Sequence, residues 1–168
     1  EMKKRNNVKL ANQFNIIKIN FKTEDKQETI DQLINLINKN NSTYSPLALY
    51  FLIDNNLTDN KSEINILFNK LIKETGVEQE IKNLIIYKKA LFNSDNSNEN
   101  DLLQILNPII NSESIWKSHS LYLMAEYFYS KNQKEKAKEF YNQILLLPNA
   151  NNDIKIESQK RLNRDLGE

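Results

Sequence analysis

The chain has 168 residues, of which 39% are hydrophobic and 27% are charged, so it can form a packed core and is not disordered throughout. Its 23 basic and 22 acidic residues give a formal net charge of +1, which argues against a nucleic-acid partner, because phosphate contacts favour a basic excess. The absence of cysteine excludes disulfides, thiol catalysis and zinc fingers, and the 2 glycines and 3 prolines argue against a β-rich fold with many tight turns.

Four stretches of the chain share one apolar spacing. In each, apolar residues occupy positions i, i+3, i+4 and i+7, which lie on one face of an α-helix. The four stripes begin at Ile30, Ile64, Leu102 and Ala137, and successive starts are 34, 38 and 35 residues apart. A helix pair that recurs about every 34 residues is typical of the tetratricopeptide repeat.

Each stripe is preceded by another apolar helix, so the sequence predicts helix pairs over about 5–40, 44–75, 79–111 and 114–148 and a capping helix over about 152–166. The hinges are rich in Asn, Asp and Ser, and Thr23, Asp59 and Ser62 are candidate helix N-caps. No pair can bury its stripe alone, so stacking is expected to form the core. We therefore predict an all-α fold of TPR-like antiparallel helix pairs, stacked as a short right-handed solenoid with a C-terminal capping helix, in a single domain over 1–168.

The prolines test this assignment. Pro46 falls in the first turn of a predicted helix, where a missing N–H has little effect, and Pro148 follows the last apolar residue of another. Pro108 lies inside the apolar run "LLQILNPII", so that helix is expected either to end near Asn107 or to bend there.

The fourth pair matches the tetratricopeptide pattern best. Ala125 and Ala137 occupy the small positions of its two helices, and Phe128 and Tyr141 occupy the aromatic positions. Small residues let two helices cross closely, and the aromatic rings fill the space beside them. Trp116 is expected to fill the junction between the third and fourth pairs.

The whole chain resembles the YfgM-like family of envelope proteins, whose members have a short cytoplasmic start, one transmembrane helix and a periplasmic tetratricopeptide-like domain. The resemblance is carried by the segments "STYSPLALYFLIDNN", "ESIWKSHSLYLMAEYFYSKNQKEKAKEFYNQIL" and "IESQKRLNRDL". The chain departs from the family in its sparse alanine content, in Ile64 and Leu102 where alanine is usual, and in Pro108. The resemblance implies an accessory role near the Sec translocon and envelope chaperones, without catalytic activity.

Membrane attachment is expected through a segment outside this sequence. No apolar run approaches the ~20 residues that span a bilayer, and the chain opens with "EMKKRNN", without an initiator Met. We expect an anchor upstream of Glu1 in a bacterial inner membrane, with this domain facing the periplasm. A cytosolic scaffold or adaptor is the alternative, and an apolar span upstream of Glu1 would separate the two.

The sequence offers no catalytic constellation. His119 is the only histidine, so a histidine-rich metal site or a histidine-based triad lacks its partners. Acidic pairs such as Glu24 and Asp25 lie in hinges, where negative charge suits the start of a helix. We therefore expect no catalytic residue, no metal and no cofactor, and a helical enzyme subunit is the less favoured alternative.

A partner-binding face is predicted on the first helix of the fourth pair. In tetratricopeptide arrays the first helices line the concave groove, and on that register His119, Tyr122, Glu126 and Tyr129 share one face. Tyrosine offers a large amphipathic contact area, so these residues are candidates for contacting a protein partner. The alternative is that the rings pack on the preceding pair. The sequence leaves the oligomeric state open.

Overall fold

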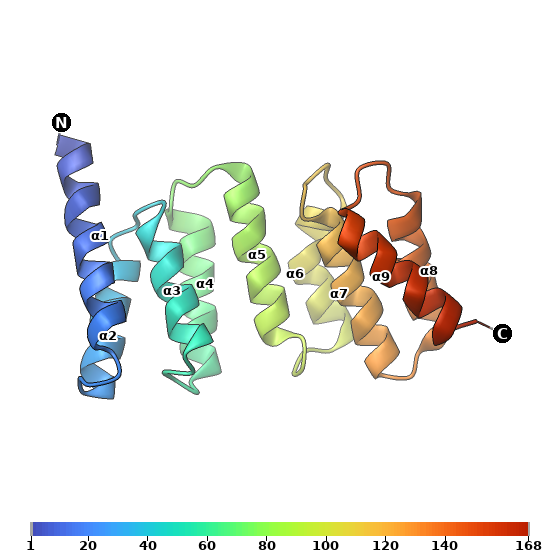
Figure 1. The fold of residues 1–168 in the computed structure, drawn as a ribbon, viewed down its shortest axis with the longest axis horizontal. Coiled ribbons are helices and arrows are strands. Elements are labelled where there is room, and N and C mark those ends of the chain that lie inside the picture. Colours follow the sequence, from blue (N-terminus) through green and yellow to red (C-terminus); the bar gives the residue numbers. More distant parts are fainter. Residues whose placement is uncertain (1, 168) are drawn as a thin grey trace. The chain divides into compact units, whose positions relative to one another are not determined.

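The fold is entirely helical throughout the part of the chain that the structure describes. That structure is a computed structural model and describes residues 2–167. Over those residues it contains nine α-helices and no strand (Figure 1), which confirms the predicted all-α class. The helices group into two compact units, Glu1–Val77 and Glu78–Glu168. A single domain over 1–168 stays a prediction.

The first unit contains four helices, each packed on the next, and its third helix also packs on its first. They are α1 (Met2–Asn20), α2 (Lys26–Ile37), α3 (Tyr44–Asp54) and α4 (Lys61–Glu74). The apolar stripe of α4 is buried at Ile64, Phe68 and Leu71, as its spacing predicts. Aromatic rings join α1 to α3, where Phe14 meets Phe51 edge to face with centroids 6.0 Å apart.

The second unit contains five helices with the same order of packing. They are α5 (Gln79–Asn93), α6 (Glu99–Ile110), α7 (Lys117–Ser130), α8 (Lys134–Leu146) and α9 (Asn152–Arg164). Each packs on the next, α7 also packs on α5, and α9 also packs on α7. Ala125 of α7 and Ala137 of α8 are fully buried, so the two small residues lie inside the helix pair. In the final helix, Ile156 is 45% exposed.

Asparagine and aspartate side chains set the helix ends. The N-caps of α2 and α4 are Asp25 and Asn60, which accept hydrogen bonds from the amides of Glu28 and Glu63, each at 3.1 Å. The candidate caps Thr23, Asp59 and Ser62 were therefore wrong by one or two positions, because the cap is the residue that reaches the third amide of the helix. After three helices the chain turns through an asparagine of positive φ, which this side chain tolerates: Asn40, Asn56 and Asn132.

We expect Asn60→Ala to destabilise α4 by about 1 kcal/mol, since the Glu63 amide loses its only capping acceptor. Hydrogen exchange of the amides in α4 would measure this change. Asn60→Asp is the matched control, because a carboxylate caps as well as an amide does. Equal exchange rates in the alanine variant and the unchanged chain would contradict the assigned cap.

Pro108 lies inside α6, which continues to Ile110. Of the two predicted alternatives, the one in which the helix ends near Asn107 is therefore wrong, and a bend at that position stays a prediction. Proline at this position removes only the hydrogen bond to the carbonyl of Gln104, four residues earlier, and Gln104 is exposed to water. The next turn remains closed, because the amide of Asn111 donates to the Asn107 carbonyl at 3.0 Å. A proline in the last turn thus interrupts the helix without ending it.

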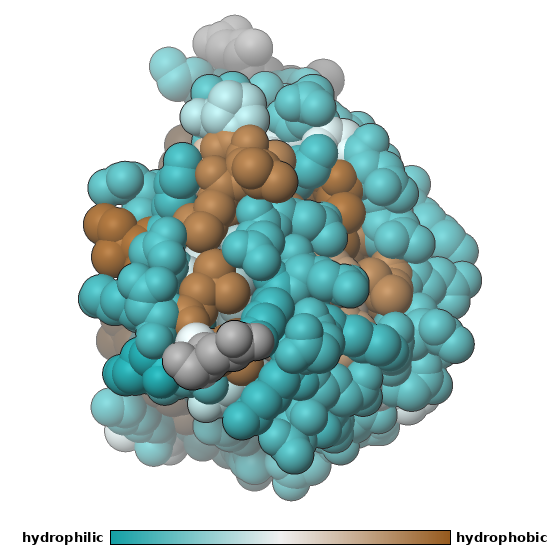
Figure 2. Space-filling view, turned by 90° about the vertical axis from the view of Figure 1, so that its right-hand side faces the viewer, coloured by the Kyte–Doolittle hydropathy of each residue, from teal (hydrophilic) through white to brown (hydrophobic). Residues whose placement is uncertain are grey.

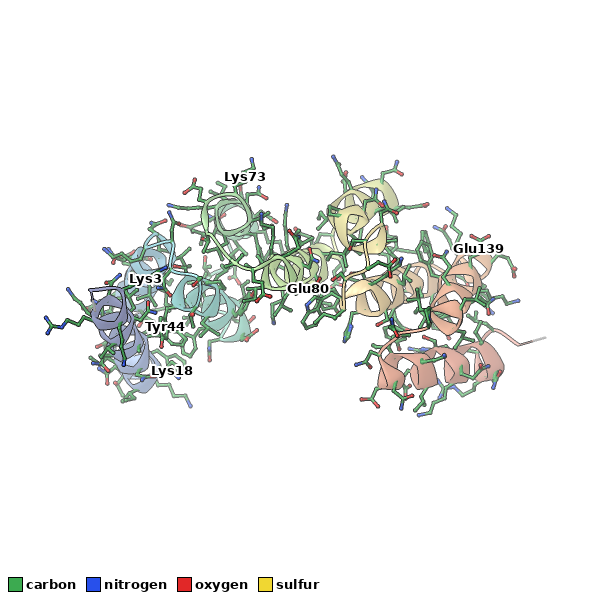
Figure 3. All side chains as sticks on the ribbon, turned by 90° about the horizontal axis from the view of Figure 1, so that it is seen from above. Lys3, Lys18, Tyr44, Lys73, Glu80 and Glu139 are labelled. Carbon is green, nitrogen blue, oxygen red and sulfur yellow. The ribbon has the colours of Figure 1, made fainter. Side chains whose placement is uncertain are left out.

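Side-chain hydrogen bonds between distant residues recur at about one repeat length. Within each unit, the bonds that connect one helix pair to the next join residues that lie 30 to 37 positions apart in the sequence. The bond between Tyr141 and Glu126, which lie in the same helix pair, spans 15. In the second unit, for example, Glu80 of α5 (labelled in Figure 3) accepts from the Ser114 hydroxyl at 2.8 Å and from the Ile115 amide at 3.2 Å. In the first unit, Asn41 donates to Asn7 at 2.9 Å. Within each unit, equivalent positions of successive helix pairs are therefore neighbours in space.

Candidate functional site

The four predicted partner-binding residues all lie on α7, and all four are half-buried. Their spacing of 3, 4 and 3 residues places them along one face of the helix. Helix α5 meets this face near the start of α7, and α9 meets it near the end. The face is therefore divided into an aromatic cluster around His119 and a polar cluster around Glu126.

The aromatic cluster joins α5 to the start of α7. The rings of Tyr87 and Trp116 stack with centroids 5.9 Å apart and an interplanar angle of 19°. His119 contacts both rings, at 5.9 Å and 5.1 Å respectively. Trp116 thus packs between the third and fourth helix pairs, as predicted from the sequence.

Burial favours the neutral form of the His119 imidazole. Loss of water lowers its pKa below the ordinary value of 6.5, and the carbonyl of Ile115, one turn earlier, opposes this only in part. The ring Nδ1 is buried and makes no hydrogen bond of regular geometry with the described residues. A neutral imidazole inside an aromatic cluster acts here as a packing group.

The polar cluster joins α7 to α8 and α9. Arg161 of α9 donates from Nε to Glu126 Oε1 at 3.0 Å and from Nη2 to Glu126 Oε2 at 2.8 Å. The Tyr141 hydroxyl of α8 also donates to Glu126 Oε1. The guanidinium lies 4.8 Å above the ring of Tyr129, and Tyr122 meets Tyr141 edge on with centroids 5.9 Å apart. Two-point pairing fixes the planes of both charged groups.

Two phenols and the guanidinium of this cluster stay protonated at neutral pH. Burial, followed by the Glu126 carboxylate, raises the pKa of both Tyr122 and Tyr141, so both phenols remain protonated. Hydrogen bonds to Asp165 and Glu126 raise the pKa of Arg161, which stays charged. Glu126 and Tyr129 therefore hold α9 against α7, while Tyr122 and Tyr129 keep part of their rings in contact with solvent.

The end of α9 is expected to loosen in acid. Arg164 and then Arg161 hold the pKa of the Asp165 carboxyl far below its ordinary value of 3.8, through hydrogen bonds of 2.8 to 3.0 Å. A depressed pKa favours the folded state above the unfolded value, so this contribution declines as the pH falls through and below 3.8. Urea midpoints recorded between about pH 5 and pH 2.5 should fall less steeply for Asp165→Asn than for the unchanged chain. Parallel curves would contradict this.

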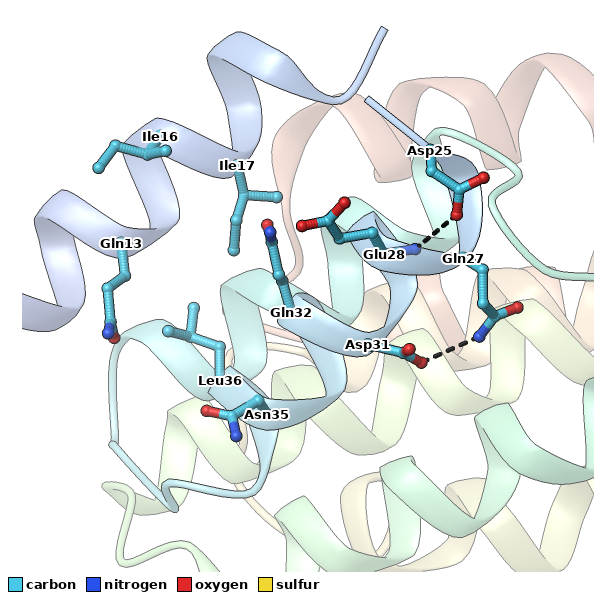
Figure 4. A pocket seen from close by; sticks show the side chains of 10 residues that line it. All are labelled: Gln13, Ile16, Ile17, Asp25, Gln27, Glu28, Asp31, Gln32, Asn35 and Leu36. Carbon is cyan, nitrogen blue, oxygen red and sulfur yellow. Dashed lines mark hydrogen bonds between the residues drawn. The ribbon is translucent and has the colours of Figure 1, made fainter. Parts of the chain in front are cut away.

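A second site, which the sequence analysis did not identify, is a pocket in the first unit. Figure 4 shows it between α1 and α2, and its volume is about 670 Å³. Ile16, Ile17 and Leu36 form its apolar wall, and three carboxylates, four side-chain amides and no cation complete it. Those polar lining residues are Gln13, Asp25, Gln27, Glu28, Asp31, Gln32 and Asn35. The clustering of acidic residues at the start of α2, opposite the basic α1, was the available signal.

The surface of the second unit, seen from the α8 and α9 side, carries both apolar and hydrophilic side chains (Figure 2). Figure 2 shows this face, where brown apolar patches are separated by teal hydrophilic side chains. Leu146 of α8 is 82% exposed and is the most exposed large apolar residue of the unit. Single apolar side chains on a surface are ordinary and indicate no binding site.

Three further findings bear on function. Among residues 2–167, no group of three or more His, Cys, Asp or Glu side chains is placed to hold a metal ion. Over the same residues, every helix is too short or too polar to cross a bilayer. Comparisons with protein-family models, with curated proteins and with solved structures found no match.

Proposed function

We propose that this chain is a non-enzymatic protein–protein interaction module, built from TPR-like helix pairs stacked as a short right-handed solenoid with α9 as its cap. The observation that carries the proposal is the spacing of 30 to 37 residues, about one repeat, in the side-chain hydrogen bonds that connect one helix pair to the next within each unit. The packing of α3 on α1, of α7 on α5 and of α9 on α7 supports it as well, since stacked pairs bring alternate helices together.

The partner would bind along the α7 face that contains His119, Tyr122, Glu126 and Tyr129. Tyr122 and Tyr129 are half-buried, so each ring is held in place by its neighbours and still offers apolar area and a hydroxyl to a ligand. Rings that are already ordered lose little side-chain entropy on binding. This combination is typical of residues that dominate interface energies.

The cellular role that we propose is that of an accessory to the Sec translocon or to envelope chaperones. The chain would be the periplasmic domain of a single-pass protein of the bacterial inner membrane, anchored by a segment upstream of Glu1. Support for this part comes from the segments that resemble the YfgM-like family. An unbroken apolar stretch of about 20 residues upstream in the full-length gene would support it further.

Site-specific crosslinking tests this function. A photo-crosslinking phenylalanine would replace Tyr122 in the full-length protein in its native cell, and irradiation should yield adducts with a translocon or envelope-chaperone component. Glu139, an exposed residue of α8 labelled in Figure 3, is the matched control position. Equal adducts at both positions, or adducts at Tyr122 that contain no envelope component, would count against the proposal.

A further inference from the structure

Helix α1 and the turn that follows it carry a strong local charge. Residues 2–22 contain six basic side chains and no acidic one. The rest of the chain therefore contains 17 basic residues and all 22 acidic ones. The six are Lys3, Lys4, Arg5, Lys9, Lys18 and Lys22. None of them forms an ion pair with any residue in the described range 2–167. Among residues 2–167, the charge of α1 therefore has no partner in an ion pair.

The same helix exposes apolar side chains. Val8 and Ile16 are each 56% exposed and Ile19 is 77% exposed, although α1 buries Leu10, Phe14 and Ile17 on its inner face. Within residues 2–77, α1 packs on α2 and α3 through that inner face. Helix α1 therefore leaves three branched apolar side chains, as well as its basic ones, in contact with solvent.

One side of α1 combines both kinds of surface, and the two lie at opposite ends. Arg5, Lys9, Gln13 and Ile16 follow one another at spacings of 4, 4 and 3 residues, so they lie along one side of the helix. Toward the start of α1 this side forms a hollow lined by cations. Toward its end it forms the pocket with an apolar wall and the carboxylates of Asp25, Glu28 and Asp31 (Figure 4).

A surface that is basic at one end and acidic at the other is complementary to itself after a rotation of 180°. We propose that this surface binds a second copy of the chain, with the two α1 helices antiparallel about a two-fold axis near Gln13. Each copy then places Arg5 and Lys9 opposite the carboxylates of its partner, and each apolar wall faces the partner's aliphatic side chains. Such an isologous contact closes at two copies.

A second copy complements both the basic and the acidic end of this surface, whereas a purely anionic partner complements only the basic end. A lipid headgroup or a nucleic acid would be attracted by Arg5 and Lys9 and repelled by the carboxylates of Glu28 and Asp31 on the same side of the helix pair. It would also leave Ile16, which is 56% exposed at the edge of the pocket, uncovered. The proposed dimer contact uses α1 and α2 and not the α7 face. A chain that does not self-associate would therefore leave the proposed function intact.

Charge reversal tests the dimer. The unchanged chain should sediment at twice its own mass at low salt, and the association should weaken about tenfold or more between about 50 and 500 mM salt. Arg5→Glu with Lys9→Glu, and separately Glu28→Lys with Asp31→Lys, should each give monomers, because like charges then face each other in both halves of the contact. An equimolar mixture of the two variants should form a heterodimer, in which every opposed pair is again attractive.

Matched reversals elsewhere on the first unit control for total charge. Lys61→Glu with Lys73→Glu, and Asp54→Lys with Asp59→Lys, change the same number of exposed charges away from the pocket and should leave the dimer intact. Circular dichroism of each variant shows that it remains helical. A monomeric unchanged chain, a failure of the mixed variants to associate, or reversed variants that keep their mass while losing affinity for anionic vesicles would overturn the proposal.

Discussion

Replacing Phe128 by alanine is expected to lower the free energy of unfolding of the second unit by about 3–5 kcal/mol. The ring is 1% exposed and lies between α7 and α8. It stacks on Phe140 with centroids 5.5 Å apart, and the ammonium of Lys136 lies 5.1 Å from its centroid. Its removal leaves a cavity that two packed helices cannot close. Urea denaturation monitored by Trp116 fluorescence would report on this unit.

Two variants show that the loss comes from the cavity. Phe128→Leu keeps most of the volume and should cost less than about 1.5 kcal/mol. Leu146→Ala removes an apolar side chain that is 82% exposed and should change stability by no more than about 0.5 kcal/mol. If Phe128→Ala were as mild as Leu146→Ala, the packing of α7 against α8 described above would be wrong.

The second large effect is expected from Arg161→Met, at about 1–3 kcal/mol. The substitution removes both donors to Glu126 and the contact with the Tyr129 ring. The Glu126 side chain is only 29% exposed, so its carboxylate would keep the Tyr141 hydroxyl as partner and lose its counter-charge. The loss should appear as faster hydrogen exchange in α9, while the amides of the first unit keep their rates.

A double-mutant cycle separates the ion pair from the other contacts of the arginine. Glu126→Gln combined with Arg161→Met should cost less than the sum of the two single changes, by about 0.5–3 kcal/mol. Lys160→Met is the matched control, because its pair with Glu157 is mostly exposed and such pairs contribute little. Additive losses would mean that Glu126 and Arg161 do not act as a pair.

The apolar spacing of the sequence was sufficient to predict the helices. The stripe that contains Ile64 and Phe68 and the one that contains Ala137 and Tyr141 are buried on the faces that a period of 3.6 residues assigns to them. Helix boundaries were predicted less accurately: the N-cap of α4 is Asn60, and not Asp59 or Ser62. Asn, Asp and Ser crowd every hinge, so composition alone does not indicate which of them reaches the amide of the third helical residue.

The candidate site shows a different limit. The sequence was sufficient to place Tyr122, Glu126 and Tyr129 on one face of a helix. It did not identify Arg161, which pairs with Glu126 and lies 35 residues after it. A contact at that distance follows from the repeat only if the register between successive pairs is known. The pocket between α1 and α2 was missed for a related reason, since its apolar wall combines residues of two helices whose crossing the sequence does not specify.

The one-repeat spacing of the long-range hydrogen bonds has a consequence for how the chain reaches its fold. When each helix finds its partners within about 35 residues, only short loops must close before packing begins. The entropy lost on closing such a loop grows only with the logarithm of its length. A nascent chain could therefore bury each pair soon after it leaves the ribosome, before later pairs have been synthesised.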